Sequence, residues 1–496
     1  MHLQKIKSLQ SLSLIPWLAL FISLPWLVHF LVTPYQSGWD ESYQIAAAIN
    51  LINGDGLTTL ELINSETQNV YLYKWPPLYS FLLVPFLLIG LGVSTSSKII
   101  TVIFVFIGFY GWLKFAKSWI KAPILQLLAM ILMMRSLSYF LLASETDYII
   151  YSIFPFFLLN LHQIAFKPSI TRKMLFSTAA LLVFFISLKY SALSLIPATA
   201  ITLVFFYHKK LELLVKHGFI ILFPPSLIYL IITFVNKHFA ATTTFVANQP
   251  YDYSFLYNLE FFKAALSKPI YNLFFSHIPV LGALTQQKNT LLIISTFFLI
   301  AFAIWLFKAR YKSTEPSHKS LIILLIFSMS ILGFFAGMTG KMMQNLPYDS
   351  FWFPLKEARY YLFLAPWILI IAISQLSKIA THKAAVLTVI VIGLYSFIGV
   401  ANLSKNRNNN VQREAIEALS ALDPEAGVIL YSDTEFFARL QSYYSKTVWF
   451  KGGYDEFTLL KEKGVISNDA LFVTNHRTNT PTKSIQVKTE HLIFVQ

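Results

Sequence analysis

The feature that most constrains this chain is a repeated succession of apolar segments separated by short clusters of Lys and Arg. A run of about 20 apolar residues forms a helix that crosses the hydrocarbon core of a bilayer. Basic clusters stay on the cytoplasmic side, which sets the direction of each segment. The pattern predicts an all-α polytopic membrane domain over residues 1–401, with a cytoplasmic N-terminus and about eleven transmembrane helices: 12–32, 99–116, 123–142, 148–165, 174–188, 191–207, 218–235, 289–307, 320–339, 360–377 and 384–401.

The composition excludes several classes of protein. Only 13% of the residues are charged and the mean hydropathy is +0.58, whereas soluble domains carry about 25% charged residues. The net charge of +15 does not indicate a nucleic-acid partner, because the basic residues lie between apolar segments. The absence of cysteine excludes disulfides and cysteine-ligated metals. The first apolar segment is followed by no small-residue cleavage site, so we expect it to be an uncleaved span.

The first loop on the outer side, residues 33–75, is unusually long for such a chain. We expect it to contain a helix over 41–53, capped by Ser37 or Asp40 and ended by Gly54. Three isoleucines share one face of this helix, so we expect it to lie along the bilayer surface: Ile45, Ile49 and Ile52.

Two other stretches depart from the spanning pattern. Residues 76–92 are apolar but short and rich in proline, which indicates a juxtamembrane or re-entrant piece. From residue 402 the chain becomes polar, and we predict a small extracytoplasmic α/β domain over 402–496. Its expected helices and strands are 411–422 and 434–444, and 428–432, 447–450 and 471–474 respectively.

Asp40 and Glu41 place two carboxylates at the edge of the membrane, where an idle charge is costly. Such a carboxylate can take a proton from a hydroxyl, with Tyr43 beside it to position a substrate. The alternative is a helix cap and its solvated neighbour. Glu145 and Asp147 follow in the next outer loop, where they would orient a sugar hydroxyl or cap the helix over 148–165.

Several cations are predicted on the same side as these acids. Lys74 precedes a Pro-Pro turn among aromatic residues, which suits a lipid phosphate at headgroup depth; alone it would be a snorkelling lysine. Lys189 interrupts an apolar stretch, as a phosphate ligand or a turn residue. Arg359, with Tyr360, opens a late span, as a phosphate fork or an outer anchor. The histidines show no ligand spacing; a divalent metal held by Asp40 or Asp147 stays open, and no cofactor is required.

These residues, in their order and sidedness, resemble those of the GT-C glycosyltransferases, in particular the branch of protein O-mannosyltransferases and lipid A aminoarabinose transferases (glycosyltransferase family 39 or 83 type). The resemblance covers about residues 10–400 and is carried by Asp40-Glu41-x-Tyr43, Lys74-x-Pro76-Pro77-Leu78-Tyr79, Asp147, Lys189 and Arg359-Tyr360.

The resemblance implies an inverting transferase of the plasma membrane that moves a sugar from a polyprenyl-phosphate donor to a hydroxyl on the outer face. By the same resemblance Asp40 is the base, with Glu41 as its neighbour, Lys74 meets the donor phosphate, and Asp147 is the second-loop acid. The acceptor is a glycolipid, a polysaccharide or a protein; the small tail lacks the sugar-binding repeats of eukaryotic protein mannosyltransferases. The alternatives are a membrane transporter, another envelope-polysaccharide ligase or polymerase, or a scaffold whose tail binds a partner.

Overall fold

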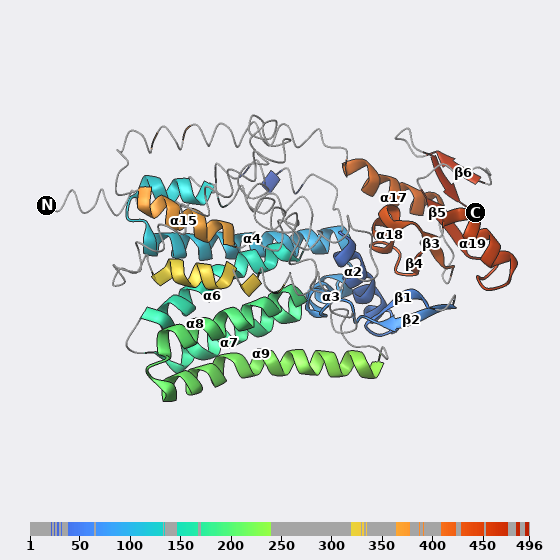
Figure 1. Cartoon of the computed structure of the whole chain (residues 1–496). Helices are drawn as coiled ribbons and strands as arrows, with labels where there is room; N and C mark the ends of the chain where they lie inside the picture. Colours follow the sequence, from blue (N-terminus) through green and yellow to red (C-terminus); the bar gives the residue numbers. More distant parts are fainter. Residues whose placement is uncertain are drawn as a thin grey trace, which may run out of the picture.

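The computed structural model describes most of the first half of the chain and parts of the second half. The described ranges, besides a few isolated positions, are 38–63, 66–131, 146–166, 170–239, 319–328, 364–376, 408–422, 428–450, 453–474, 483–486 and 492–495. Within them the protein is mostly helical, with a bundle at one side and a small α/β sheet at the other (Figure 1).

The bundle is built from long apolar helices that lie side by side (Figure 1). Among the described residues, four helical stretches are long and apolar enough to cross a membrane: Val93–Trp119 (α4), Asp147–Phe166 (α6), Tyr190–Tyr207 (the 3-10 helix η1, Tyr190–Ser194, continued by α8, Leu195–Tyr207) and Leu211–Phe239 (α9). Two further helices of the bundle are α7 (Arg172–Leu188) and α15 (Ala365–Leu376). The predicted segments that fall on these ranges are therefore helical, whereas the total of eleven spans extends beyond the described residues.

Glycine allows α4 and α6 to approach closely. A Cβ atom at Gly111 would lie 2.6 Å from the ring of Phe156, and one at Gly108 would lie 2.8 Å from the backbone of Ser152. Small residues of this kind let helix backbones pack within a membrane, where burial of apolar surface gives little driving force.

Pro155 interrupts α6 at the same contact, and α4 compensates for it. Proline has no N–H, so the carbonyl of Tyr151, four residues earlier, loses its helical donor. The indole nitrogen of Trp112 on α4 donates to that carbonyl at 3.0 Å. The bond satisfies a backbone group that lipid could not.

A buried histidine joins α6 to the later part of the bundle. His162 contacts the hydroxyl of Ser320 at 2.7 Å, in the helical segment Lys319–Ser328. Trp367 of α15 donates to the same hydroxyl at 3.0 Å. The network brings residues about 200 positions apart to one point in the core.

The described residues of the predicted first outer loop fold into a helix and a hairpin. Helix α2 (Trp39–Ile52) begins two residues earlier than predicted: Gly38 is its N-cap residue, so Asp40 lies in the first turn and not at the cap. Asn53 follows the helix and Gly54 takes a φ of +89°, as a terminating glycine should. The strands β1 (Thr58–Ile63) and β2 (Glu66–Tyr71) then pair antiparallel, a hairpin that the sequence analysis did not predict.

The prediction that α2 lies along the bilayer surface is wrong. All residues from Glu41 to Ala48 are buried, so α2 has no solvent or lipid face over two turns. It packs against α3 (Leu78–Leu88) on one side and the C-terminal α/β domain on another. Helix α3, at 11 residues, is too short to span, as expected for 76–92.

The C-terminal region forms a five-stranded mixed sheet of order β4-β3-β5-β7-β6, in which β3 is parallel to β4 and β5, and β7 is antiparallel to β5 and β6. The two expected helices and three expected strands are present: the first helix begins three residues early, the second helix and the first two strands are shorter than expected, and the third strand has the expected bounds. The third helix and the last two strands were missed. The elements are α17 (Asn408–Leu422), β3 (Leu430–Ser432), α18 (Thr434–Gln441), β4 (Thr447–Trp449), α19 (Gly453–Glu462), β5 (Leu471–Thr474), β6 (Lys483–Gln486) and β7 (Leu492–Val495).

This sheet is packed against the first outer loop (Figure 1). Leu60 of β1 lies in one apolar cluster with Tyr431 and Phe472 of the sheet. The hydroxyl of Ser42 on α2 donates to the side-chain oxygen of Gln441 at 2.9 Å, across 399 residues of sequence. The α/β region therefore covers α2 and the hairpin.

The close approach of α4 and α6 predicts an asymmetry between two glycines. Gly111→Ala should lower the free energy of unfolding by about 1–3 kcal/mol, because the new methyl group overlaps Phe156 and Pro155. Gly218→Ala on α9, which meets nothing within 4 Å among the described residues, should be neutral or raise it by up to about 1 kcal/mol through helix propensity. Thermal unfolding of the two purified variants measures this; equal melting temperatures would contradict the packing.

Candidate active site

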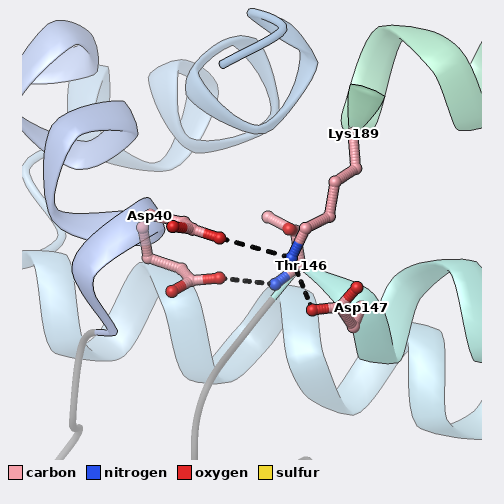
Figure 2. Close-up of polar contacts among 5 residues, drawn as sticks. Asp40, Thr146, Asp147 and Lys189 are labelled. Atoms are coloured by element: carbon pink, nitrogen blue, oxygen red, sulfur yellow. Dashed lines mark hydrogen bonds and ion pairs between the residues drawn. The ribbon is translucent and has the colours of Figure 1, made fainter. Parts of the chain in front are cut away.

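The most buried charged cluster among the described residues is built around Lys189. Its ammonium lies 2.5 Å from a carboxylate oxygen of Asp147 and 3.4 Å from one of Asp40 (Figure 2). The three side chains are 6%, 6% and 15% exposed. An isolated buried charge would cost several kcal/mol, so each member depends on the other two.

Three different elements bring these side chains together. Asp40 belongs to the first turn of α2, and Asp147 is the first residue of α6. Lys189 lies where α7 ends and η1 begins, with an extended backbone (φ −156°, ψ 133°) that breaks the helix. This break lets the lysine point away from the helix axis toward both acids (Figure 2).

Glu41, next to Asp40, is tied to the same place by a backbone contact. Its carboxylate accepts from the N–H of Thr146 at 2.6 Å, and Glu41 is fully buried. Thr146 directly precedes α6, where backbone N–H groups point outward and a carboxylate is stabilised. Adjacent acids on α2 therefore hold the start of α6 twice, through Lys189 and through Thr146.

Lys74 lies in a second charged cluster, formed with the hairpin. Its ammonium is 2.8 Å from a carboxylate oxygen of Glu61 on β1, and the two side chains are 21% and 12% exposed. The same ammonium stands over the rings of Tyr43, at 4.9 Å, and Tyr73, at 5.7 Å. Burial, the charge of Glu61 and a hydrogen bond to Glu61 raise the pKa of the Tyr73 hydroxyl to about 12, so this hydroxyl stays protonated.

Tyr43 connects the two clusters. It lies one turn beyond Asp40 on α2, its ring stacks on Trp75 at 4.7 Å, and it contacts Phe437 of the α/β domain at 5.5 Å. The side chain is 2% exposed. The ring of Tyr43 thus packs against the ammonium of Lys74. The predicted contact of Tyr43 with a substrate stays a prediction.

The loop that carries Lys74 is attached to the bundle. Asn236, near the end of α9, donates to the carbonyl of Tyr73 at 3.3 Å and to the hydroxyl of Tyr190 at 3.2 Å. The Tyr190 hydroxyl donates to the same carbonyl at 3.3 Å. Because Tyr190 follows Lys189, one short segment contacts both clusters.

The structure thus unites Asp40, Asp147 and Lys189, and places Lys74 one helical turn away over Tyr43. Arg359, Tyr360 and Glu145 lie outside the described residues, so their part in the site stays a prediction. The described part of the chain contains no group of three His, Cys, Asp or Glu residues that could hold a metal ion.

Three residues of the site were missed by the sequence analysis: Glu61, Thr146 and Gln44. Glu61 had a signal, because it is a lone carboxylate in the apolar run Thr58-Thr-Leu-Glu-Leu-Ile63. Thr146 acts through its backbone, which no residue pattern reports. Gln44 follows Asp40 by one turn, is fully buried, and has no hydrogen-bond partner for either amide atom among the described residues.

The fold defines a helical membrane protein with a small α/β sheet at one end of its bundle. The solved structures similar to it include ArnT from Cupriavidus metallidurans in the apo state, with a TM-score of 0.54, 13% identity and 97% of each chain covered. A structure of ArnT bound to undecaprenyl phosphate gives a TM-score of 0.49, 12% identity and the same coverage. At this identity the likeness shows the fold alone. No protein-family model and no curated protein matches the chain.

The ion pairs of Lys189 predict a large loss of stability when its charge is removed. Lys189→Met leaves two buried carboxylates without their shared cation, which should cost about 3–5 kcal/mol of unfolding free energy. Adding Asp147→Asn removes one of those charges and should restore part of the loss. Chemical denaturation of both variants tests this. A Lys189→Met variant as stable as the wild type would show that the ion pairs do not contribute to stability.

Gln44 predicts the opposite behaviour. Since its buried amide makes no hydrogen bond among the described residues, Gln44→Met should raise the unfolding free energy by about 1 kcal/mol or more. The matched control on the same helix is Asn50→Leu, which removes the bond of 2.9 Å from the Asn50 amide to the carbonyl of Thr58 and should lower it by about 1 kcal/mol. The melting temperatures of the two variants test this prediction. A lower melting temperature for Gln44→Met would contradict the finding that the buried Gln44 amide makes no hydrogen bond among the described residues.

Proposed function

We propose that this protein is an inverting glycosyltransferase that moves a sugar from a polyprenyl-phosphate donor to a hydroxyl acceptor on the outer face of the plasma membrane. The observation that carries the proposal is the buried Asp40–Lys189–Asp147 cluster, held where the helix bundle meets the α/β domain. The fold shared with ArnT, a GT-C lipid A aminoarabinose transferase, supports it. The predicted eleven spans, cytoplasmic N-terminus and extracytoplasmic tail are part of the proposal.

The proposed reaction is one displacement at the anomeric carbon. The acceptor oxygen forms a bond to that carbon as its proton passes to the carboxylate of Asp40. The bond between the anomeric carbon and the phosphate oxygen breaks, and its electron pair leaves with the polyprenyl phosphate. A phosphate leaving group needs no acid to protonate it. One displacement inverts the anomeric configuration.

Lys189 keeps Asp40 ready for this role through two contacts. Its ammonium holds one carboxylate oxygen of Asp40 at 3.4 Å. The second pair, to Asp147, fixes the lysine from the other side, so the carboxylate is held in one orientation. We propose that Lys189 positions the two acids; its predicted contact with the donor phosphate stays a prediction.

The other site residues keep, in this proposal, the roles that the sequence predicts for them. We propose that Lys74, with Arg359 and Tyr360, faces the donor phosphate, where fixed cations in a water-poor site stabilise the developing charge. Asp147 and Glu145 would orient sugar hydroxyls, and Glu41 would hold α2 against α6 through Thr146. The acceptor stays a glycolipid, polysaccharide or protein hydroxyl.

The test is transfer of label from radiolabelled polyprenyl-phosphate hexoses by membranes that contain the protein. Asp40→Asn should lower the rate by about 10²- to 10⁴-fold, the usual contribution of a general base. The matched control is Asp55→Asn, at an exposed acid beyond the end of α2, which should leave the rate unchanged.

Two outcomes would contradict the proposal. An Asp40→Asn variant with wild-type transfer would remove the base from the scheme. A product of retained anomeric configuration would exclude a single displacement. If the protein is a membrane transporter or a scaffold, even the wild type should transfer no label. If it is another envelope ligase or polymerase that does not use Asp40 as a base, the transfer of label should survive the substitution.

A further inference from the structure

The ammonium of Lys74 is already occupied in this structure, by the carboxylate of Glu61 at 2.8 Å. We propose that Glu61 is a regulatory residue: it neutralises Lys74 while no donor is bound and competes with the donor phosphate for it. The inference rests on the proposed function, since it assumes that Lys74 receives the phosphate. In this proposal the β1–β2 hairpin controls access of the donor phosphate to Lys74 through the carboxylate of Glu61.

Glu61 has the chemical surroundings that a phosphate oxygen would need. Its carboxylate lies 2.8 Å from the ammonium of Lys74 and is near enough to the hydroxyl of Tyr73 to raise the pKa of that group. A phosphate diester is also an anion that accepts from ammonium and hydroxyl donors. The two anions therefore require the same donor set.

Both anions cannot occupy Lys74 together without repulsion. Glu61 and Lys74 are largely withdrawn from water, and like charges in such surroundings repel more strongly than in bulk solvent. The arriving phosphate must displace the carboxylate or fail to bind. Lys74 stays in place during this exchange, because the rings of Tyr43 and Tyr73 lie beneath its ammonium.

The hairpin connects Glu61 to the α/β domain. Side chains alternate between the two faces of a strand, so Leu60 and Leu62 share the face opposite to Glu61. Those two leucines pack with Tyr431 and Phe472 of the sheet. One face of β1 is thus anchored in the α/β domain while the other presents the carboxylate to Lys74, which gives the C-terminal region a defined influence on the site.

The experiment is a binding titration of the purified full-length protein at low ionic strength, with farnesyl phosphate as the probe and farnesol as the probe without phosphate. Glu61→Gln keeps the shape and the acceptor for Tyr73 but removes the competing charge. It should tighten farnesyl phosphate binding by about three- to fivefold, the size expected for a partly exposed ion pair, and leave farnesol binding unchanged.

A matched control separates this effect from a change of net charge. Glu66→Gln alters an exposed acid on β2 of the same hairpin, whose described contact is with Gln68, and it should leave both affinities unchanged. In a Lys74→Ala background, Glu61→Gln should have no effect, because the cation for which the anions compete is gone.

The outcomes distinguish this inference from the proposed function. If Lys74→Ala weakens farnesyl phosphate binding but Glu61→Gln weakens it too or leaves it unchanged, Glu61 does not compete with phosphate and the inference is overturned while the phosphate role of Lys74 stands. If Lys74→Ala leaves binding unchanged, the phosphate role of Lys74 in the proposed function fails. Tightening by Glu61→Gln that disappears without Lys74 supports both.

Discussion

The arrangement of the described chain depends on one buried cation shared by two carboxylates. Lys189 can be buried only because Asp40 and Asp147 face it, and neither acid could be buried without Lys189. The three residues come from the first outer loop, the start of α6 and the break after α7. Their pairing therefore fixes how the loop sits on the bundle, and any substrate that reaches Asp40 meets a carboxylate whose direction is already set.

Helix α2 connects this cluster to Lys74 and to the α/β domain. Its first turn holds the acids, its next turn carries Tyr43 under Lys74, and its flank packs on α18 through Phe437 and Ala438. A helix that is buried on all sides over residues 41–48 cannot shift without disturbing each of these contacts. The α/β domain, although it begins about 360 residues later in the chain, is thus part of the support of the candidate site.

The sequence predicts which charged residues lie on one side of the bundle better than it predicts how they are packed. Asp40, Asp147 and Lys189 could be placed on one side because charge clusters and apolar lengths determine sidedness without any packing knowledge. The surroundings of α2 could not be predicted, because the residues that bury it, such as Phe437, are distant in the chain. Glu61 was missed for the same reason: its partner Lys74 meets it only once the hairpin has folded back.

The separation of the two charged clusters suits a displacement reaction. A base and a leaving group must lie on opposite sides of the carbon at which the bond is exchanged. Asp40 and Tyr43 are three residues apart on α2, where side chains are neighbours at about 5–6 Å between Cβ atoms, and Lys74 stands 4.9 Å above the ring of Tyr43. Asp40 and Lys74 are thus separated by the ring of Tyr43 and one turn of α2 and are not paired with each other. Each has its own counter-ion, Lys189 for Asp40 and Glu61 for Lys74, and the proposed reaction requires this separation of base and phosphate ligand.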